Sequence, residues 1–414
     1  MVGSTSLWQL ELNEAGKAIS SNPLQGTCET EVAVIGAGIT GTATALWLAR
    51  AGINVRVLEA RGIAAGASGR NGGFIAYGTT ASYSNVIQRY GREQARRLWA
   101  FTIGNHELLK SLIDELEQSG WSCSYRRNGS MKLALSEPEL EQVIQSTSLL
   151  IEDGWEVQIV PRNDLPVRLQ KAYFGGVYYP ANGEFHPAKF VTGLASLAQQ
   201  AGVVFHDESQ VVGISANEDG ILLQTPGGTV HARTLILATN AWLPEIGGLL
   251  GADWLSSCIF PTRGQVIATE PVSEQLFPYP CSADEGYQYW RQLPDGRLVV
   301  GGWRNRSFDT ELQTYDETPN EAIQQHLDAF VHETLKLPHV NITNRWAGIM
   351  GFTADNLPLI GHLPGVPNCF IAGGYTGHGN AFAIHAAKLV SELVQGKMNP
   401  DVVLFDPARF DSGL

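Results

Sequence analysis

A glycine-rich turn between an apolar run and a helical stretch constrains this chain most. Residues 31–35 form a short apolar run with three β-branched residues, which predicts a buried strand. Residues 39–50 have helical spacing, and residues 55–58 predict a second strand that ends at Glu59. The turn itself follows the pattern G-x-G-x-x-G, with Gly36, Gly38 and Gly41. This strand–turn–helix–strand order is typical of a βαβ unit that binds a dinucleotide.

The residue types of this turn suit a diphosphate. Gly36 permits the tight turn, Gly38 lets the backbone approach a pyrophosphate, and Gly41 lets the helix pack closely on the sheet. Free N–H groups and the dipole at the helix start favour negative charge there. Glu59 can accept hydrogen bonds from a ribose and would repel a 2′-phosphate, so NADP is disfavoured. The alternative is a glycine turn without a ligand.

Charge and cysteine content exclude several classes of function. The net charge of −13 argues against nucleic acid or an anionic membrane as the main partner. The five cysteines are scattered without a C-x-x-C pair, which suits a reducing compartment and predicts no metal site. Residues 1–31 have no secretion signal, and no apolar run is long enough for an integral membrane segment. We therefore expect a cytoplasmic location.

Two further glycine-rich stretches predict contact with a large ligand. Residues 61–74 are mostly small, which suits a backbone that lies flat against a planar group, although a flexible linker is the alternative. Ser68, Arg70 and Asn71 within it could bond phosphate or ring heteroatoms. Residues 373–380 form another strand-to-helix turn, whose helix start again favours negative charge.

Changes of pattern along the chain predict two interleaved domains, in an α/β fold (α+β overall). We expect a lead-in over 1–29, then a discontinuous dinucleotide-binding domain with a parallel sheet, formed by 30–90, 172–243 and 345–414. The remainder, 91–171 and 244–344, predicts a substrate domain with a mainly antiparallel sheet and flanking helices.

Together these stretches resemble the FAD-dependent amine and amino-acid oxidases of the D-amino acid oxidase, glycine oxidase and sarcosine oxidase superfamily. The run at residues 67–73, Ala-Ser-Gly-Arg-Asn-Gly-Gly, is most similar to the branch that contains γ-glutamylputrescine oxidase. The resemblance covers nearly the whole chain after residue 30. It implies a Rossmann-type FAD-binding domain and oxidation of an amine or amino-acid-like substrate.

The resemblance also implies which residues hold FAD. Ile39 and Thr40 would lie at the pyrophosphate, Glu59 and Ala60 at the ribose, and Val211 would bond the adenine through its backbone. The full set of expected contacts is Gly36, Ala37, Gly38, Ile39, Thr40, Gly41, Glu59, Ala60, Arg61, Ala67, Ser68, Arg70, Asn71, Gly72, Gly73, Phe74, Val211, Ala238, Thr239, Asn240, Trp242, Gly348, Gly374, Tyr375, Thr376, Gly377, His378, Gly379 and Asn380.

Two departures from the family pattern bear on the substrate. Relatives that oxidise α-amino acids usually hold the carboxylate with an arginine in Gly-x-Arg-Pro, where this chain has Met350. A second arginine, of the glycine oxidase type, would fall at Gly377. We therefore expect that a simple α-amino acid is not the best substrate unless another arginine substitutes. The candidates are Arg263, Arg291, Arg304 and Arg306, although most arginines lie on surfaces or in ion pairs, which favours a structural function for each.

The expected catalytic residues are His378, Tyr289, Arg291 and Met350. Tyr289, Trp290 and Arg291 would form a wall that faces the substrate, or else belong to an ordinary core. A protonated His378 would stabilise negative charge on the flavin, and the alternative is a neutral histidine that holds the turn. The family attaches flavin covalently through a cysteine or histidine, and neither matching position carries one, so we expect non-covalent FAD.

The expected reaction is hydride transfer from the carbon of a C–N bond to flavin N5, followed by imine hydrolysis. Reoxidation by O2 would then give hydrogen peroxide. One alternative is a flavin dehydrogenase that passes electrons to a quinone or a carrier. An alternative of another class is a non-catalytic FAD-binding redox or assembly module.

Overall fold

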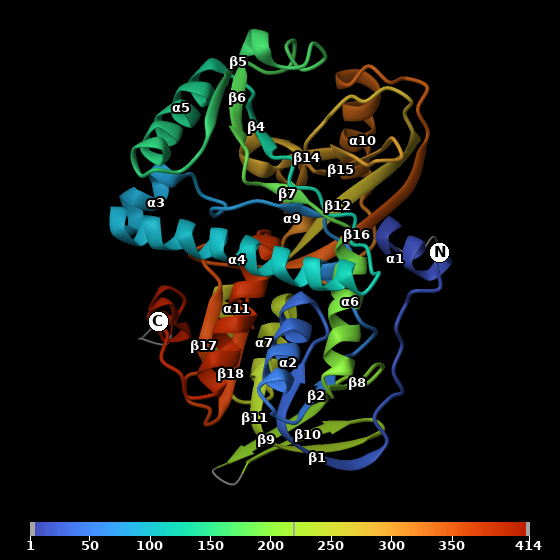
Figure 1. Cartoon of the computed structure of the whole chain (residues 1–414), viewed down its shortest axis with the longest axis vertical. Coiled ribbons are helices and arrows are strands. Elements are labelled where there is room, and N and C mark those ends of the chain that lie inside the picture. The colour runs from blue at the N-terminus through green and yellow to red at the C-terminus, as the bar shows by residue number, and fades with distance from the viewer. Residues whose placement is uncertain (1–4, 218–219, 411–414) are drawn as a thin grey trace.

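The protein, seen in a computed structural model that describes residues 5–217 and 220–410, is built on two large sheets stacked along its long axis (Figure 1). The lower sheet has eight strands, in the order β17-β18-β11-β1-β2-β8, with β10 paired to β11 and β9 paired to β10. Its strands β1, β2, β8, β11 and β18 pair in parallel. The bounds are β1 (Gly26–Ile35), β2 (Val55–Leu58), β8 (Val204–His206), β9 (Gly213–Asn217), β10 (Gly220–Thr225), β11 (Gly228–Leu237), β17 (Leu359–His362) and β18 (Cys369–Gly373).

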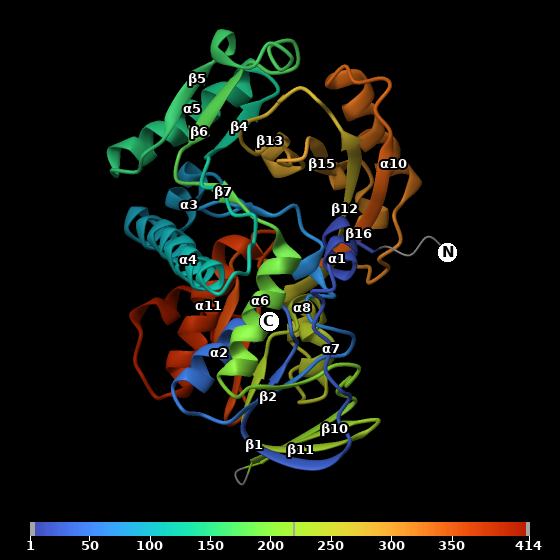
Figure 2. The same ribbon diagram turned by 45° about the vertical axis from the view of Figure 1, so that its right-hand side comes forward.

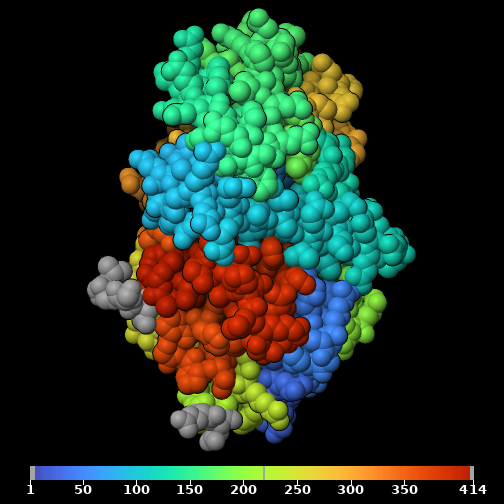
Figure 3. All heavy atoms as spheres, turned by 60° about the vertical axis from the view of Figure 1, so that its left-hand side comes forward, coloured from blue at the N-terminus to red at the C-terminus, as the bar shows by residue number. Residues whose placement is uncertain are grey.

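Helices cover the lower sheet and separate it from the upper one. Helix α2 packs between α6 and α11, and α4 runs across α11 at the junction of the two halves (Figures 1 and 2). Figure 3 shows the C-terminal segment, in red, directly below the α3–α4 segment, in light blue. These helices are α2 (Ile39–Arg50), α3 (Tyr83–Tyr90), α4 (Arg92–Gln118), α6 (Pro187–Gln200), α7 (Leu243–Gly248), α8 (Leu255–Cys258) and α11 (Gly379–Val394).

The upper sheet is antiparallel except for the β13–β4 pair, and its order is β16-β12-β15-β14-β13-β4-β6-β5. Its strands are β4 (Ser130–Ala134), β5 (Gln158–Pro161), β6 (Gly175–Tyr179), β12 (Ile259–Pro271), β13 (Cys281–Ala283), β14 (Gln288–Gln292), β15 (Arg297–Gly302) and β16 (Ile342–Thr353). Helices α5 (Glu137–Glu152), α9 (Phe308–Glu311) and α10 (Glu321–Ala329) flank it, and β3 (Phe74–Ile75) pairs with β7 (Gly183–Glu184) below it.

The fold class predicted from the sequence is confirmed, with a sheet rich in parallel pairs and a mainly antiparallel sheet. Strand β6 falls within 172–243, which we assigned to the dinucleotide-binding domain, yet it pairs with β4 and β5 in the upper sheet. The domain boundaries otherwise stay a prediction. Among the described residues, no helix combines the length and apolar character needed to cross a bilayer.

The N-terminal segment is not the loose lead-in that we expected over 1–29. Residues Leu7–Glu14 form helix α1, which begins with a capping box between Ser6 and Gln9. Trp8 is 1% exposed, and its indole N–H donates to the carbonyl of Asn71 at 2.8 Å. The Ser6 hydroxyl donates to the carbonyl of Gly69 at 2.6 Å. Helix α1 therefore braces the glycine-rich stretch 61–74. The first strand begins at Gly26, before the expected end of the lead-in at residue 29.

Candidate active site

A cavity of about 470 Å³ lies at the carboxyl ends of β1, β2 and β11, which we call the first cavity. In a parallel sheet, ligands bind at this edge. Most of the residues expected to contact FAD line it: Gly36, Gly38, Ile39, Thr40, Glu59, Ala60, Arg61, Ala67, Ser68, Asn71, Val211, Ala238, Thr239, Asn240, Trp242, Tyr375, Gly377, Gly379 and Asn380.

The glycines of the first turn are required by close approaches of the backbone. A Cβ on Gly41 would lie 1.9 Å from the carbonyl oxygen of Gly36. Gly36 has a φ of 105°, and a Cβ there would lie 2.8 Å from the carbonyl oxygen of Ala238. Helix α2 starts at Ile39, whose N–H donates to the Ser68 hydroxyl at 2.9 Å. The turn therefore brings a helix N-terminus to the cavity wall, with only the small Ser68 side chain beside it.

Glu59 takes the position predicted for the acidic residue, at the end of β2 and on the cavity wall. Its carboxylate accepts hydrogen bonds from the backbone N–H groups of Ala37 at 2.8 Å and Arg61 at 2.9 Å. Burial raises the pKa of Glu59, and these two N–H groups oppose that rise.

The first cavity also holds polar atoms that lack a partner. Thr239 Oγ1 and Glu317 Oε1 are buried, and neither has a hydrogen-bond partner among the described residues. Buried polar atoms are normally bonded, so these two oxygens fit a polar ligand better than a dry wall. Together with the uncrowded helix start, they fit the dinucleotide that the sequence predicted.

Two glycine-rich stretches some 300 residues apart meet at the inner end of this cavity. The amide of Asn380 donates to Asn71 Oδ1 at 3.0 Å and to the carbonyl of Phe74 at 2.9 Å. Asn71 Oδ1 also accepts from the N–H of Gly73 at 2.7 Å. Asn71 thus holds the shape of its own loop and joins that loop to the start of α11.

A second cavity, of about 460 Å³, continues from the first toward the upper sheet. Aromatic rings form much of its wall: Phe74, Tyr287, Tyr289 and Phe352. The rings of Phe74 and Tyr289 meet edge to face at 5.7 Å. Five residues line both cavities and so mark the boundary between them: Ala67, Asn71, Met350, Gly377 and Asn380.

Met350 reaches this boundary because β16 extends from the upper sheet to the second glycine turn. The N–H of Thr376 donates to the carbonyl of Gly351 at 2.8 Å, and the Thr353 N–H donates to the Thr376 hydroxyl at 3.1 Å. Other predicted residues that line the second cavity are Arg70, Gly72, Phe74, Gly348, Thr376 and His378. Ala37, Gly41, Gly73 and Gly374, also expected to contact FAD, line neither cavity.

His378 lies in the wall of the second cavity, and burial lowers its pKa to about 4. The positive charges of Lys132 and Arg304 lower it further. The ring is therefore neutral near pH 7, as in the second of the two interpretations from the sequence. Its Nδ1 has no hydrogen-bond partner among the described residues.

The wall predicted from Tyr289, Trp290 and Arg291 is only partly correct. Tyr289 lines the second cavity, but Trp290 points to the other face of β14 and is fully buried. Arg291 lies outside both cavities, because its guanidinium is paired with Glu184 and donates to the carbonyls of Gly73 and Phe185. We therefore leave Arg291 out of the catalytic set and assign it to bracing the glycine-rich loop.

Arg70 lines the second cavity, and its guanidinium is also bound by the protein itself. Its guanidinium donates to the carbonyls of Ala65 at 2.8 Å and Ala347 at 3.0 Å, and it pairs with Glu317 at 3.4 Å. Burial lowers its pKa. These contacts tie the loop to β16 at the edge of the cavity, and contact between Arg70 and a ligand stays a prediction.

Known proteins are similar to this chain in sequence and in fold. A family model described as "FAD dependent oxidoreductase" matches residues 31–393. The chain belongs to this family of FAD-dependent oxidoreductases. It is 28% identical to the probable oxidoreductase OrdL of Haemophilus influenzae, over 90% of this chain and 85% of that protein. It is also 28% identical to γ-glutamylputrescine oxidoreductase of Escherichia coli, over 96% of this chain and 89% of that protein.

The glycine oxidase structure from Geobacillus kaustophilus has the same fold, with a TM-score of 0.79 and 23% identity. The match covers 92% of this chain and 98% of that one. The resemblance proposed from the sequence is thereby confirmed at the level of the family. FAD is the cofactor of the family, and the first cavity of this oxidoreductase meets its chemical requirements.

The sequence did not point to several residues of the site. Tyr315 and Glu317 line the first cavity from the segment after α9, and Tyr315 lies against Trp242 with ring centroids 5.4 Å apart. Tyr287 and Phe352 line the second cavity, beside Arg304, which the sequence offered only as one of four candidate arginines. Gly301 and Gly302, which end β15 before Arg304, were a usable signal, because paired glycines often mark a close approach of the backbone.

Proposed function

We propose that this oxidoreductase oxidises a C–N bond of an amine or amino-acid-like substrate held in the second cavity. The observation that carries the proposal is the continuity of the two cavities across the shared residues Met350, Gly377 and Asn380. A substrate in the second cavity would lie directly against whatever occupies the inner end of the first.

The residues that would hold FAD are those of the first cavity. The start of α2 would face the pyrophosphate, Glu59 the ribose, and the start of α11 the flavin. Helix α11 has no side-chain cap, so its first N–H groups stay available for negative charge. When bound, FAD supplies the electron acceptor, a flavin N5 that takes the hydride from the carbon next to nitrogen.

The chain's own residues would bind, orient and desolvate the substrate. Rings of Tyr289 and Phe352 exclude water, and an amine out of water is favoured in its neutral form, which gives up a hydride more readily. Neutral His378 adds no charge beside it. The imine product would be hydrolysed by water, and O2 as final acceptor would leave hydrogen peroxide.

Two relatives bear on the type of amine. The Escherichia coli protein is a γ-glutamylputrescine oxidoreductase, and another relative, at 25% identity, is a glycine oxidase. At the positions where α-amino acid oxidases of this family carry arginines, this chain has Met350 and Gly377. This supports an amine whose carboxylate, if present, is held elsewhere than at the end of β16 or the α11 turn.

An anaerobic bleaching screen tests the proposal. Purified holoenzyme is mixed with pools of polyamines, γ-glutamyl amines, N-methyl amino acids, D- and L-amino acids and cyclic amines, while the flavin absorbance is followed. We expect rapid bleaching by one amine pool. If no pool bleaches the flavin, the non-catalytic FAD-binding module becomes the better hypothesis.

Admitting air to the bleached enzyme then tests the electron acceptor. Recovery of the colour with one hydrogen peroxide per amine supports an oxidase. Slow recovery in air together with fast reduction of a quinone dye supports a dehydrogenase that feeds a quinone or carrier.

We also propose that FAD is bound without a covalent bond. No cysteine of the described residues lines either cavity. Acid precipitation should therefore leave a yellow supernatant, whereas a yellow pellet after washing would contradict this proposal.

A further inference from the structure

We infer that Arg304 is the anion anchor of the second cavity, so that the substrate carries a carboxylate as well as the oxidised amine. This inference rests on the proposed function and narrows its substrate class. Arg304 follows β15 and lines the second cavity together with Tyr289, Met350 and His378.

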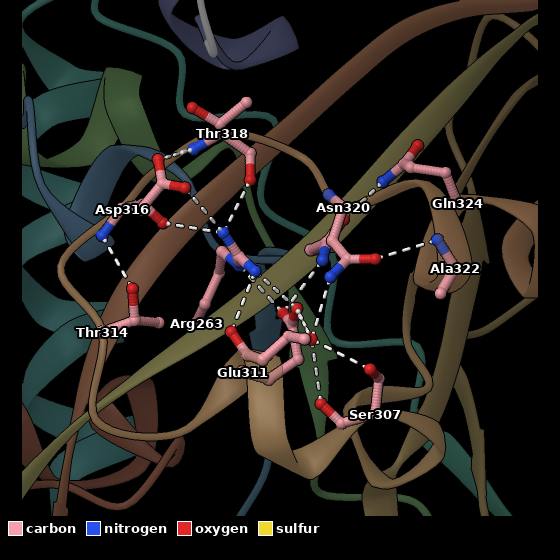
Figure 4. A network of polar contacts seen from close by, with 11 residues as sticks. Arg263, Ser307, Glu311, Thr314, Asp316, Thr318, Asn320, Ala322 and Gln324 are labelled. Atoms are coloured by element: carbon pink, nitrogen blue, oxygen red, sulfur yellow. Dashed lines mark hydrogen bonds and ion pairs between the residues drawn. The ribbon is translucent and has the colours of Figure 1, made fainter.

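Three of the four candidate arginines are already engaged or face solvent. Arg263 is 5% exposed, and its guanidinium is bound by the carboxylates of Glu311 at 2.8 Å and Asp316 at 3.1 Å (Figure 4). Arg291 is paired with Glu184. Arg306 is exposed at the surface. Of the four, only Arg304 lines the first or the second cavity, and within residues 5–217 and 220–410 it forms no ion pair with a carboxylate.

Arg304 is held between two aromatic rings. Its guanidinium carbon lies 4.4 Å from the centre of the Tyr287 ring and 5.0 Å from that of Phe352. Cation–π contacts and a hydrogen bond to the Tyr287 side chain hold the guanidinium, and these partners leave several of its five N–H groups for an anion. The rings thus fix the side chain in place without neutralising its charge.

The backbone before Arg304 is arranged to turn this side chain into the cavity. Trp303 has a φ of 57°, a left-handed conformation that is a genuine outlier for a bulky residue. Its ring is 6% exposed and packs against Phe330 at 5.0 Å, in the core of the upper sheet. The chain therefore reverses at Trp303, which places Trp303 in the core and Arg304 on the cavity wall.

The other charges around the cavity leave Arg304 as the cation for a ligand. Arg70 also lines the cavity but is bonded to two carbonyls and Glu317. Glu285 lines it too, with an exposed side chain. Burial lowers the pKa of Arg304, and a guanidinium stays charged even so. A half-buried guanidinium that has no paired carboxylate can bind the carboxylate of a ligand.

The test compares acids with their neutral amides as ligands of the holoenzyme. Acetate, butyrate and benzoate, each beside its primary amide, are titrated by calorimetry into the wild type and into Arg304→Met, Arg304→Lys and Arg306→Met. Arg306→Met is the matched control, because it removes an exposed arginine from the same turn. The FAD content of each variant is measured first, so that a folding defect is seen directly.

We expect the wild type to bind at least one acid roughly 10- to 100-fold more tightly than its amide, as for a hydrogen bond to a charged group. Arg304→Met should lose this preference, Arg304→Lys should keep part of it, and Arg306→Met should keep all of it. If Arg304→Met does not fold, the inference is tested by Arg304→Lys, whose preference for the acid over the amide should be weaker than that of the wild type. Equal binding of acids and amides by the wild type, including no binding of either, would overturn the inference.

The same variants separate this inference from the proposed function. If an amine bleaches the flavin equally well in the wild type and in Arg304→Met, the anion anchor is wrong while amine oxidation stands. If the acid preference depends on Arg304 but no amine bleaches the flavin, the anchor stands and the proposed reaction fails.

Discussion

The two cavities of this oxidoreductase are built by different means. Glycines, backbone N–H groups and small side chains form the first cavity, and they come mainly from three strand-to-helix or strand-to-loop turns. Side chains from β12, β14, β16 and their connections form the upper wall of the second, and these come together through the pairing of distant strands. The first cavity should therefore tolerate no added bulk, while the second should tolerate exchange of its side chains with altered ligand preference.

The largest effect should come from bulk in the first turn. In Gly41→Val the added atoms would meet the carbonyl of Gly36, so the turn could form only by moving α2. We expect FAD affinity to fall by about 100-fold or more. Fluorescence titration of the apoprotein with FAD measures this. Gly62→Ala is the control, because a Cβ there has nothing within 4 Å. If Gly41→Val bound FAD with normal affinity, the turn would be able to move and accommodate the side chain, which contradicts this prediction.

The next effect should come from helix α1, which lies outside both cavities. Trp8→Ala removes a buried indole that packs 4.8 Å from the Arg291 guanidinium and bonds the carbonyl of Asn71. We expect the free energy of unfolding to fall by about 3–5 kcal/mol, with weaker FAD binding. Urea unfolding of the holoenzyme measures it.

Trp8→Phe serves as the control, since it keeps most of the packing and loses one hydrogen bond, worth about 1 kcal/mol. If the two variants lose equal stability, the indole N–H rather than the packing braces the loop.

A smaller effect, confined to the second cavity, should follow from Tyr289→Ala. The ring lies over Gly301 and against Phe74, at the substrate side of the boundary. We expect kcat/KM for the identified amine to fall by about tenfold, while FAD affinity stays within about threefold. Steady-state kinetics and FAD titration of one preparation give both numbers. An equal loss of FAD affinity would show that the two cavities are not separable.

The smallest effect should be that of pH on the affinity of the second cavity for an anion. A protonated His378 would add a positive charge beside a bound anion, so affinity for benzoate would rise as the pH falls through its pKa. Because burial lowers that pKa to about 4, this rise should be absent above pH 5.5. We expect less than about a twofold change between pH 6 and 8. A rise centred near pH 6.5 would restore the interpretation with a protonated histidine.

The difference between the cavities also explains what the sequence could predict. The glycine pattern and Glu59 were sufficient to predict the first cavity as a dinucleotide site. Such a site requires fixed residue types at short spacing, and the family shares them. Arg304 could only be one of four candidates, since its exposure to the cavity depends on the β14–β15 register and on the reversal at Trp303. Arg291 was misassigned because Gly73 and Phe185, distant in sequence, cover it.

Helix α1 was missed although a signal was present. Ser6 and Gln9 have the spacing of a capping box, which marks the start of a helix. The apolar residues Leu7, Trp8 and Leu12 cover too short a stretch for helical periodicity to stand out. An isolated helix of eight residues is also unstable in water, so it forms only where tertiary contacts support it.

These supporting contacts have a consequence for the order of events during synthesis. Glu11 pairs with Arg297, which follows it in the chain by 286 residues. At a translation rate of about 5–20 residues per second, the ribosome needs roughly 15–60 s to add that length. During this interval the nascent chain has made the βαβ unit and the loop that Ser6 and Trp8 contact, but not the arginine that pairs with Glu11. Firm retention of FAD therefore belongs to the finished chain, after the last glycine turn has left the ribosome.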